Sequence, residues 1–299
     1  PVAKHGNRSV SSKSGAADVL EELGVVLSLT PEQNEKVLAD TGICFLFAQG
    51  YHKSMKNVAP VRKGMGERTI FNVLGPLSNP ARATMQLLGV YDENLVMPMA
   101  QVLSNLGVTR GMVVCGGGMD EGSLIGDNKV CEIRDGRLTP YQLDPEKYGL
   151  SLCTVDDLRG GSPRVNAQIT RDILSGREQG ARREEILLNA GIALYLGLDG
   201  LTLEDGIKKA AELIDSGAAL AKLDQFAAAT HDSRRTGRFR PETGRGRSGE
   251  NTARGYKSAG GSHAEGRFPL REGAGREGLR VYLRGEKGEP VQGRHRPGI

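Results

Sequence analysis

The stretch that decides the fold lies near the start of the chain, where residues 4–15 read Lys-His-Gly-Asn-Arg-Ser-Val-Ser-Ser-Lys-Ser-Gly. It gathers two ammonium groups, a guanidinium and five hydroxyl or amide side chains around two glycines. Such a loop can offer backbone N–H groups and cations to an anion, and a helix predicted to begin near Ala16 adds the partial positive charge of its N-terminus. The alternative is a solvated polar loop without a ligand, and composition alone leaves both interpretations open.

Outward from this loop, short apolar runs alternate with helical patterns. Thr30 and Gln33 form a capping box with Pro31 in the first turn, which predicts the start of a helix. Buried strands are predicted at 43–47, 87–90 and 112–115, and a hairpin at 130–135 and 137–143. Further helices are predicted over 18–23, 94–106, 166–174, 184–196 and 203–216. The alternation indicates an α/β protein whose central mixed or parallel sheet is flanked by helices.

Composition separates the chain into two parts. The whole chain of 299 residues is 38% hydrophobic with a net charge of +4. From Asp232 to the end there are 16 Lys and Arg against 8 Asp and Glu, while the rest carries 24 against 28. The chain has neither an apolar run of about 20 residues nor the apolar region of a signal peptide, which predicts a cytoplasmic protein without a membrane partner. The four cysteines form no close pair and are expected to be reduced thiols in the core.

Three later motifs narrow the class. Residues 60–72 read Pro-Val-Arg-Lys-Gly-Met-Gly-Glu-Arg-Thr-Ile-Phe-Asn, residues 75–80 read Gly-Pro-Leu-Ser-Asn-Pro, and residues 118–121 read Gly-Met-Asp-Glu. Together with residues 4–15, they resemble the anthranilate phosphoribosyltransferase family over the range from Pro1 to about Ala229. The resemblance implies a fold like that of nucleoside phosphorylases and phosphoribosyltransferases. Its reaction joins anthranilate to phosphoribosyl diphosphate in tryptophan biosynthesis.

The same resemblance implies a set of site residues. Asn7 and Arg62 correspond to the residues that hold anthranilate, and Asp120 and Glu121 to ligands of magnesium, with two ions expected. Gly122 departs from the family, which usually has an apolar residue there. The residues that correspond to the phosphoribosyl diphosphate site are Lys4, His5, Gly6, Asn7, Arg8, Ser9, Val10, Ser11, Ser12 and Ala16.

The chemistry of these residue types agrees with those roles. A guanidinium such as that of Arg62 can pair with the anthranilate carboxylate in a planar fork, although a plain surface charge is the alternative. Adjacent carboxylates beyond the end of a strand suit a hard cation that also contacts ligand oxygens, although a solvated turn is the alternative. The transfer needs positioning and charge stabilisation more than covalent help, so no nucleophile or catalytic triad is expected. His5 is interpreted as a shaping and binding residue.

Other interpretations remain open at this stage. A pyrimidine nucleoside phosphorylase of the same fold is one, and a non-catalytic paralogue that binds nucleic acid is another. The acidic balance of the first part argues against nucleic acid as a partner. Family members form homodimers and begin with a small helical domain, a Gly-Thr-Gly-Gly-Asp loop and an Asn-x-Ser-Thr segment. None of these precedes Lys4, so we expect a chain without the small helical domain, with doubtful dimerisation and little activity by itself.

The sequence predicts a partial phosphoribosyltransferase domain over residues 1–230 and a disordered tail over 231–299. Fifteen of the last 68 residues are Gly, and 14 are Arg. Such a tail could bind phosphate backbones. Read one base later, however, the codons from Val281 onward permit Phe-Ile-Cys-Glu-Val-Lys-Lys-Ala-Ser-Pro-Ser-Lys-Gly, which resembles indole-glycerol-phosphate synthase. We therefore interpret the tail as frame-shifted read-through into a neighbouring gene, which the nucleotide sequence would test.

Overall fold

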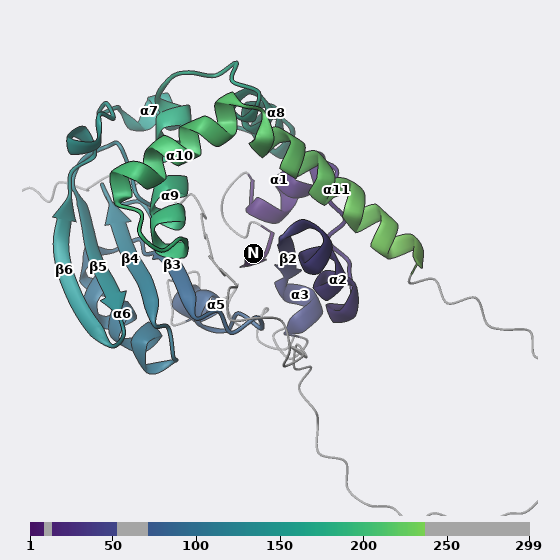
Figure 1. The fold of residues 1–299 in the computed structure, drawn as a ribbon, viewed down its shortest axis with the longest axis horizontal. Coiled ribbons are helices and arrows are strands. Elements are labelled where there is room, and N and C mark those ends of the chain that lie inside the picture. Colours follow the sequence, from purple (N-terminus) through teal and green to yellow (C-terminus); the bar gives the residue numbers. More distant parts are fainter. Residues whose placement is uncertain (9–13, 53–70, 237–299) are drawn as a thin grey trace, which may run out of the picture.

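The computed structural model describes residues 1–8, 14–52 and 71–236. Within them, the strands form two sheets, one of two strands in the order β1-β2 and one of four strands in the order β3-β4-β5-β6. Helices cover both sheets, and the long helix α11 runs diagonally past the smaller one (Figure 1). The predicted α/β architecture with a mixed sheet is confirmed, although the described strands divide into two sheets rather than one.

The smaller sheet pairs β1 (Val2–Gly6) with β2 (Ile43–Phe47) in parallel. The prediction that residues 4–6 belong to a loop is wrong, because these residues are the last three of strand β1. The reason lies in the alternation of burial along β1, where Ala3 and His5 are buried while their neighbours are partly exposed. A polar sequence therefore forms a strand because every second residue faces the core.

The larger sheet is mixed. Strand β3 (Met85–Gly89) runs parallel to β4 (Arg110–Gly116), and β4 runs antiparallel to β5 (Asn128–Arg134). The last strand, β6 (Arg137–Leu143), pairs with β5 through the predicted hairpin. The carboxyl ends of β3 and β4 therefore lie at the same edge, which is where ligands bind in many α/β proteins.

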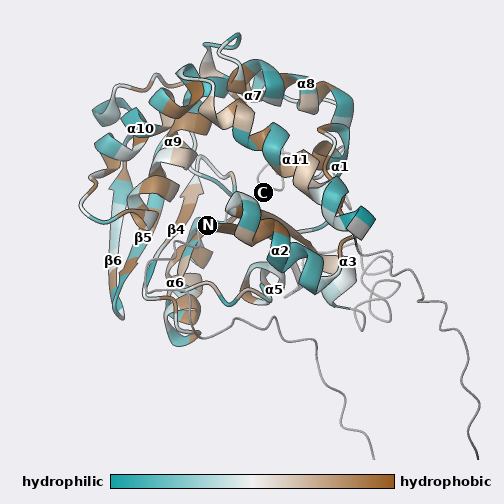
Figure 2. Ribbon diagram, turned by 45° about the vertical axis from the view of Figure 1, so that its right-hand side comes forward, coloured by the Kyte–Doolittle hydropathy of each residue, from teal (hydrophilic) through white to brown (hydrophobic). Residues whose placement is uncertain are grey.

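The two faces of the larger sheet have separate cores. One face contributes side chains such as Met112 and Val130, which pack against Leu188 and Ile192 of α9 (Ala181–Gly197). The other face packs against α6 (Val96–Asn105). Hydrophobic residues are concentrated on β4 and α9, whereas β6 is largely hydrophilic (Figure 2). The sheet is thus buried between helices along β4, and β6 forms an exposed edge.

Most of the remaining helices lie close to their predicted positions, but the long helix α11 (Ala218–Thr236) is not predicted. Helix α2 has the predicted capping box, in which Thr30 Oγ1 accepts a hydrogen bond from the backbone N–H of Gln33. Short helices that the sequence analysis does not predict are α3, α5 and α7, together with two 3-10 turns. The bounds not yet given are α1 (Ala16–Glu22), α2 (Pro31–Thr41), α3 (Ala48–Tyr51), α5 (Phe71–Leu77), η2 (Glu93–Leu95), η3 (Pro145–Tyr148), α7 (Val155–Leu158), α8 (Pro163–Leu174) and α10 (Leu203–Asp215).

Helix α11 passes through the predicted domain boundary at residue 230. Thr230 Oγ1 accepts a hydrogen bond from the backbone N–H of Val26 at 3.0 Å, and the Ser233 carbonyl accepts one from Gln33 Nε2 at 2.9 Å. Because both contacts cross to the N-terminal part, the ordered unit extends beyond residue 230. The rest of the predicted tail, and with it most of the frame-shift interpretation, lies outside the described residues.

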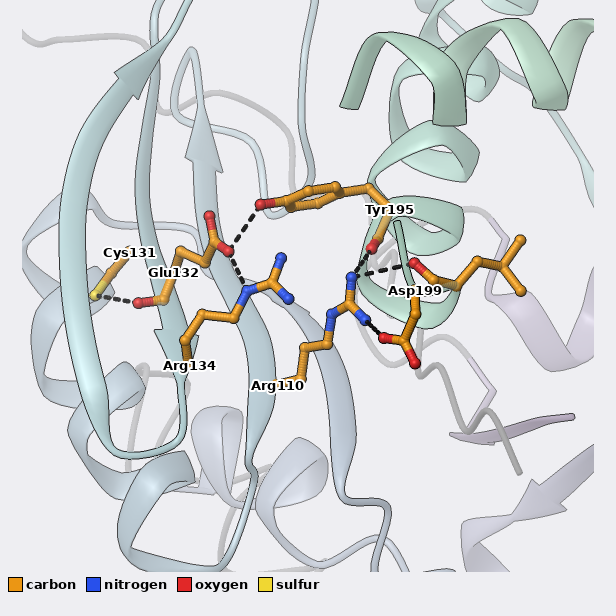
Figure 3. Close-up of polar contacts among 7 residues, drawn as sticks. Arg110, Cys131, Glu132, Arg134, Tyr195 and Asp199 are labelled. Atoms are coloured by element: carbon orange, nitrogen blue, oxygen red, sulfur yellow. Dashed lines mark hydrogen bonds and ion pairs between the residues drawn. The ribbon is translucent and has the colours of Figure 1, made fainter. Parts of the chain in front are cut away.

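A polar cluster fixes the C-terminal end of α9 to the larger sheet (Figure 3). The buried Arg110 guanidinium donates to the Tyr195 carbonyl oxygen at 2.5 Å and pairs with Asp199 Oδ1 at 2.6 Å. Glu132 Oε1 accepts hydrogen bonds from Arg134 Nε at 2.6 Å and from the Tyr195 hydroxyl at 2.9 Å. Arg110 thereby places a positive charge against the carbonyl end of the helix, where it is favourable.

Three of the four cysteines lie in the core as predicted, while Cys153 is half-buried. All four are free, and Cys44, Cys115 and Cys131 are buried. Burial raises the pKa of the Cys115, Cys131 and Cys153 thiols, which favours the unreactive protonated form. Among the described residues, none of the helices is both long enough and apolar enough to cross a membrane.

Candidate active site

The first part of the candidate site is the end of β1. Gly6 is the last residue of the strand, and a Cβ atom there would lie 2.9 Å from the Phe45 ring. Asn7 follows, and its Oδ1 accepts hydrogen bonds from the backbone N–H of Arg8 at 2.9 Å and from Gln49 Nε2 at 3.4 Å. Gly6 therefore permits a close passage of the chain past the Phe45 ring at the end of the strand.

The Arg8 guanidinium is held by two carboxylates of α1. Its Nη1 lies 2.8 Å from Asp18 Oδ1 and 2.5 Å from Glu21 Oε2. These hydrogen bonds, first that to Glu21 and then that to Asp18, raise the pKa of Arg8 above its usual range. Asp18 also accepts a hydrogen bond from the Gly15 backbone N–H at 2.9 Å, next to Ala16 at the start of the helix. Arg8 and Asp18 thus fix both ends of the segment that connects β1 to α1.

His5 is buried, with an exposed fraction of 3%. Its Nδ1 lies 3.1 Å from the Gly75 carbonyl oxygen, which can only accept, so Nδ1 carries the proton. Its Nε2 lies 3.2 Å from Nε2 of His52, so the two rings share a hydrogen bond. Both nitrogens of His5 are therefore engaged by the protein, as suits the shaping role predicted for this residue.

The motif at residues 75–80 joins the same strand. Asn79 Nδ2 donates to the Ala3 carbonyl oxygen at 3.1 Å, and Asn79 Oδ1 accepts from the Ala81 backbone N–H at 3.0 Å. Together with the contact between His5 and Gly75, this brings two predicted motifs together over a sequence separation of 70 residues or more. Helix α5, which contains Gly75, lies between the two sheets (Figure 1).

Not every predicted site residue can be placed. Lys4 lies on β1, and Ala16 is the first residue of α1. Four residues of the predicted phosphoribosyl diphosphate segment and one predicted anthranilate residue lie outside the described residues: Ser9, Val10, Ser11, Ser12 and Arg62.

The carboxylates Asp120 and Glu121 lie in a turn that follows β4. Gly117 and Gly118 have φ angles of 57° and 81°, which the turn requires and which glycine adopts without strain. The backbone of Asp120 packs against Gly89 at the end of β3, because a Cβ atom there would lie 1.6 Å from the Asp120 carbonyl oxygen. Asp120 and Glu121 are half-buried at the carboxyl ends of two parallel strands.

Side chains of α9 hold the residues that follow. Asn189 Oδ1 accepts a hydrogen bond from the Gly122 backbone N–H at 2.9 Å, and Asn189 Nδ2 donates to the Gly122 carbonyl oxygen at 2.6 Å. Glu185 Oε2 accepts from the Leu124 backbone N–H at 2.8 Å. The sequence analysis does not identify Asn189, Glu185 or His52, because each acts through a contact between distant segments.

The donor set fits a magnesium ion. Mg²⁺ is usually held by one or two carboxylates, while water and phosphate oxygens complete its coordination. Asp120 and Glu121 supply two such carboxylates, and the described residues contain no group of three or more His, Cys, Asp or Glu placed to hold a metal. Two carboxylates would leave the other coordination positions of such an ion to water or to oxygens of a substrate.

An open cavity of about 480 Å³ lies beside the same turn. Three carboxylates and one ammonium group line it, those of Asp92, Glu93, Asp127 and Lys129. The excess of negative charge disfavours an anionic substrate in this cavity.

The fold and the site define a class of transferase. Residues 1–220 match the family model described as "Glycosyl transferase family, a/b domain". A relative from Endomicrobium trichonymphae, "Anthranilate phosphoribosyltransferase", is 53% identical over 234 residues, which cover 78% of this chain and 69% of the relative. The chain belongs to the anthranilate phosphoribosyltransferase family.

Solved structures agree with this assignment. The anthranilate phosphoribosyltransferase from Thermus thermophilus superposes with a TM-score of 0.73 at 42% identity, covering 77% of this chain and 68% of that one. The Saccharomyces cerevisiae enzyme "in complex with PRPP and Mg" gives a TM-score of 0.71 at 32% identity, with 77% and 65% covered. These matches favour neither the pyrimidine nucleoside phosphorylase nor the nucleic-acid-binding paralogue.

Proposed function

We propose that this chain transfers the phosphoribosyl group of phosphoribosyl diphosphate to the amine of anthranilate, giving phosphoribosylanthranilate and diphosphate. The observation that carries the proposal is the union of the 4–8 and 75–80 motifs through His5, Gly75, Asn79 and Ala3. The 75–80 motif resembles the anthranilate branch, whereas the nucleoside phosphorylases share a looser form of the 4–8 motif. The structure of a family member contains phosphoribosyl diphosphate and Mg.

In the reaction, the bond between the ribose anomeric carbon and the diphosphate oxygen breaks as the anthranilate nitrogen forms a bond to that carbon. The nitrogen gives up a proton, and the diphosphate leaves with the bonding electrons. We assign anthranilate to Asn7 and Arg62, and phosphoribosyl diphosphate to Lys4–Ser12 and Ala16. Positioning by these groups supplies much of the catalysis, because the two reactants are held in an orientation that bulk water does not provide.

We assign Asp120 and Glu121 to magnesium, with two ions at the site. When bound, magnesium would stabilise the negative charge on the departing diphosphate. The role of the two carboxylates is to fix the cation beside the diphosphate. The role of His5 is to hold strand β1 in place through its contacts with His52 and the Gly75 carbonyl oxygen. Neither role requires a covalent bond to the substrate.

We further propose that the protein acts in the cytoplasm, that it forms a homodimer when the surface used by its relatives is complete, and that it binds neither membranes nor nucleic acid. The family of its relatives, which acts on small molecules, supports the first part. Light scattering of the purified protein tests the dimer, and a salt-dependent DNA-binding assay on residues 1–236 tests the last part.

A substrate comparison tests the proposed reaction. The purified chain is incubated with Mg²⁺ and either anthranilate plus phosphoribosyl diphosphate or thymidine plus phosphate, and the products are identified by mass spectrometry. We expect phosphoribosylanthranilate in the first reaction, formed slowly, and no thymine in the second. Release of thymine without formation of phosphoribosylanthranilate would contradict the proposal. The Arg62→Lys variant should raise the KM for anthranilate, because lysine cannot form the planar two-bond contact with a carboxylate.

A further inference from the structure

The loop that carries Asp120 and Glu121 is held by side chains of two other elements. From β5, the wholly buried Asn128 accepts a hydrogen bond from the Ser123 backbone N–H at 2.6 Å and donates to the Ser123 carbonyl oxygen at 2.9 Å. From α9, Asn189 makes the equivalent pair of hydrogen bonds to Gly122. Two successive residues directly after Glu121 therefore have their backbone donors and acceptors bound by side-chain amides.

The side chains of α9 that hold the loop are Asn189 and Glu185, and Asn189 is itself held on the helix. Asn189 and Glu185 lie one helical turn apart on α9, and Asn189 Nδ2 also donates to the Glu185 carbonyl oxygen at 3.0 Å. Glu185 is buried, with an exposed fraction of 6%, and its carboxylate accepts the Leu124 backbone N–H. Burial of a carboxylate is unfavourable unless hydrogen bonds compensate it. The use of a buried carboxylate to hold this loop therefore indicates that the position of the loop matters.

Gly122 leaves room for the side-chain amide that holds the loop. A Cβ atom on Gly122 would lie 3.2 Å from Ile192 Cδ1 and 3.3 Å from Asn189 Oδ1, both closer than ordinary van der Waals contacts, and 3.5 Å from Leu188 Cδ2. A larger residue would therefore crowd α9 and Asn189 itself, whereas glycine lets the amide reach the backbone. The two hydrogen bonds of Asn189 hold the peptide groups on either side of Gly122, and one of these is the peptide bond to Glu121.

We propose that Asn189 is a positioning residue for the metal carboxylates: through Gly122 it fixes the orientation in which Asp120 and Glu121 meet the cation. The proposal rests on the assignment of these carboxylates to magnesium under the proposed function. Asn189 itself touches neither metal nor substrate in this role. It acts as outer groups do in other metal sites, where loss of one commonly weakens metal binding about 10–100-fold.

The chain contains a matched control in Asn166 of α8. Asn166 Oδ1 accepts a hydrogen bond from the Gly161 backbone N–H at 2.7 Å, and Asn166 Nδ2 donates to the Gly161 carbonyl oxygen at 3.3 Å. Asn166 and Asn189 are both half-buried and both hold one glycine by its N–H and C=O. Asn166→Ala therefore removes the same kind of contact from a loop that carries no metal carboxylate.

The test is a titration of the whole chain with Mn²⁺ in the presence of inorganic diphosphate. Mn²⁺ broadens the NMR signals of nearby amides, so the signals of Asp120 and Glu121 report the affinity of the site without turnover. We expect Asn189→Ala to need about 10-fold more Mn²⁺ for half-maximal broadening, and Asn166→Ala to match the wild type. Hydrogen exchange of the Gly122 and Leu124 amides should become faster only in Asn189→Ala.

Asn189→Asp is a second variant in case the alanine variant does not fold. It keeps the acceptor for the Gly122 N–H but sets a carboxylate oxygen against the Gly122 and Glu185 carbonyl oxygens, which also only accept, so a loss of Mn²⁺ affinity is expected here too. An unchanged Mn²⁺ affinity in both Asn189 variants overturns the positioning role, as does an equal loss in Asn166→Ala. If the wild-type signals of Asp120 and Glu121 do not broaden at all, the metal assignment of the proposed function fails, and the positioning role fails with it.

Discussion

Substitution of Gly89 by alanine should damage both the fold and the metal site. A Cβ atom on Gly89 would lie 1.6 Å from the carbonyl oxygen and 2.2 Å from the carbonyl carbon of Asp120, whereas real Cβ atoms essentially never approach within 3.0 Å. The neighbour is backbone and cannot rotate away. In a close-packed interior the turn must therefore move by more than about 1 Å to admit the methyl group.

Two magnitudes follow from that displacement. Overpacking of a core costs typically about 1–3 kcal/mol, and we expect a value in the upper part of this range because the collision is with backbone. A misplacement of about 1 Å at a catalytic site can cost about 100-fold in rate. Gly89→Ala should thus lower the free energy of unfolding. It should also lower the affinity of Asp120 and Glu121 for the metal ion and slow phosphoribosyl transfer.

Urea denaturation measures the first effect, and Mn²⁺ titration of the Asp120 and Glu121 amide signals measures the second. The matched control is Gly126→Ala, in the same loop, where an added Cβ atom meets nothing within 4 Å. The control should stay within about 0.5 kcal/mol of the wild type. The reasoning is refuted if Gly89→Ala is as stable as Gly126→Ala and binds Mn²⁺ equally well.

Three further predictions concern the fold. Arg110→Met leaves carbonyl oxygens at the end of α9 without their buried donor, so urea denaturation should show a loss of about 2–3 kcal/mol, while Mn²⁺ affinity at Asp120 is unchanged. Burial raises the pKa of Tyr51 from 10.0 to about 12, so its contribution to stability is complete below pH 10 and is lost as the pH rises through about 12. Tyr51→Phe should therefore flatten the plot of unfolding free energy against pH between these values, and an unchanged slope would contradict the assignment. Ending the chain after residue 229 removes the hydrogen bonds of residues 230–233 and should cost about 1–3 kcal/mol relative to ending it after residue 236, whereas equal melting temperatures would place the boundary at 230.

The elements that the sequence predicts best are those whose pattern is local. Strand β2 and the capping box at Thr30 agree with the structure because an apolar run and a capping pair need no distant partner. Strand β1 escapes prediction because its burial depends on pairing with β2, 41 positions away by register. Helix α11 is not predicted either. Its buried residues follow helical spacing, but two of the four are polar, so the apolar period is broken: Leu223, Phe226, Thr230 and Ser233.

The candidate site shows the same division. Its carboxylates and its Lys-His-Gly-Asn-Arg segment are recognisable from literal motifs. Two of their supports are single side chains from other elements that lie in none of these motifs: His52 on His5 and Asn189 on Gly122. An isolated His or Asn in a sequence is uninformative, because its partner is a backbone group of another segment that only the tertiary structure brings near.

The central claim is that the chain joins anthranilate to phosphoribosyl diphosphate with a metal held by Asp120 and Glu121. The most direct measurement compares the wild type with the Asp120→Asn/Glu121→Gln double variant, at fixed anthranilate and phosphoribosyl diphosphate and increasing Mg²⁺, with phosphoribosylanthranilate quantified by mass spectrometry. The account predicts product that rises with Mg²⁺ in the wild type and is lost in the double variant. Equal product from both proteins, or product that does not depend on Mg²⁺, would contradict it.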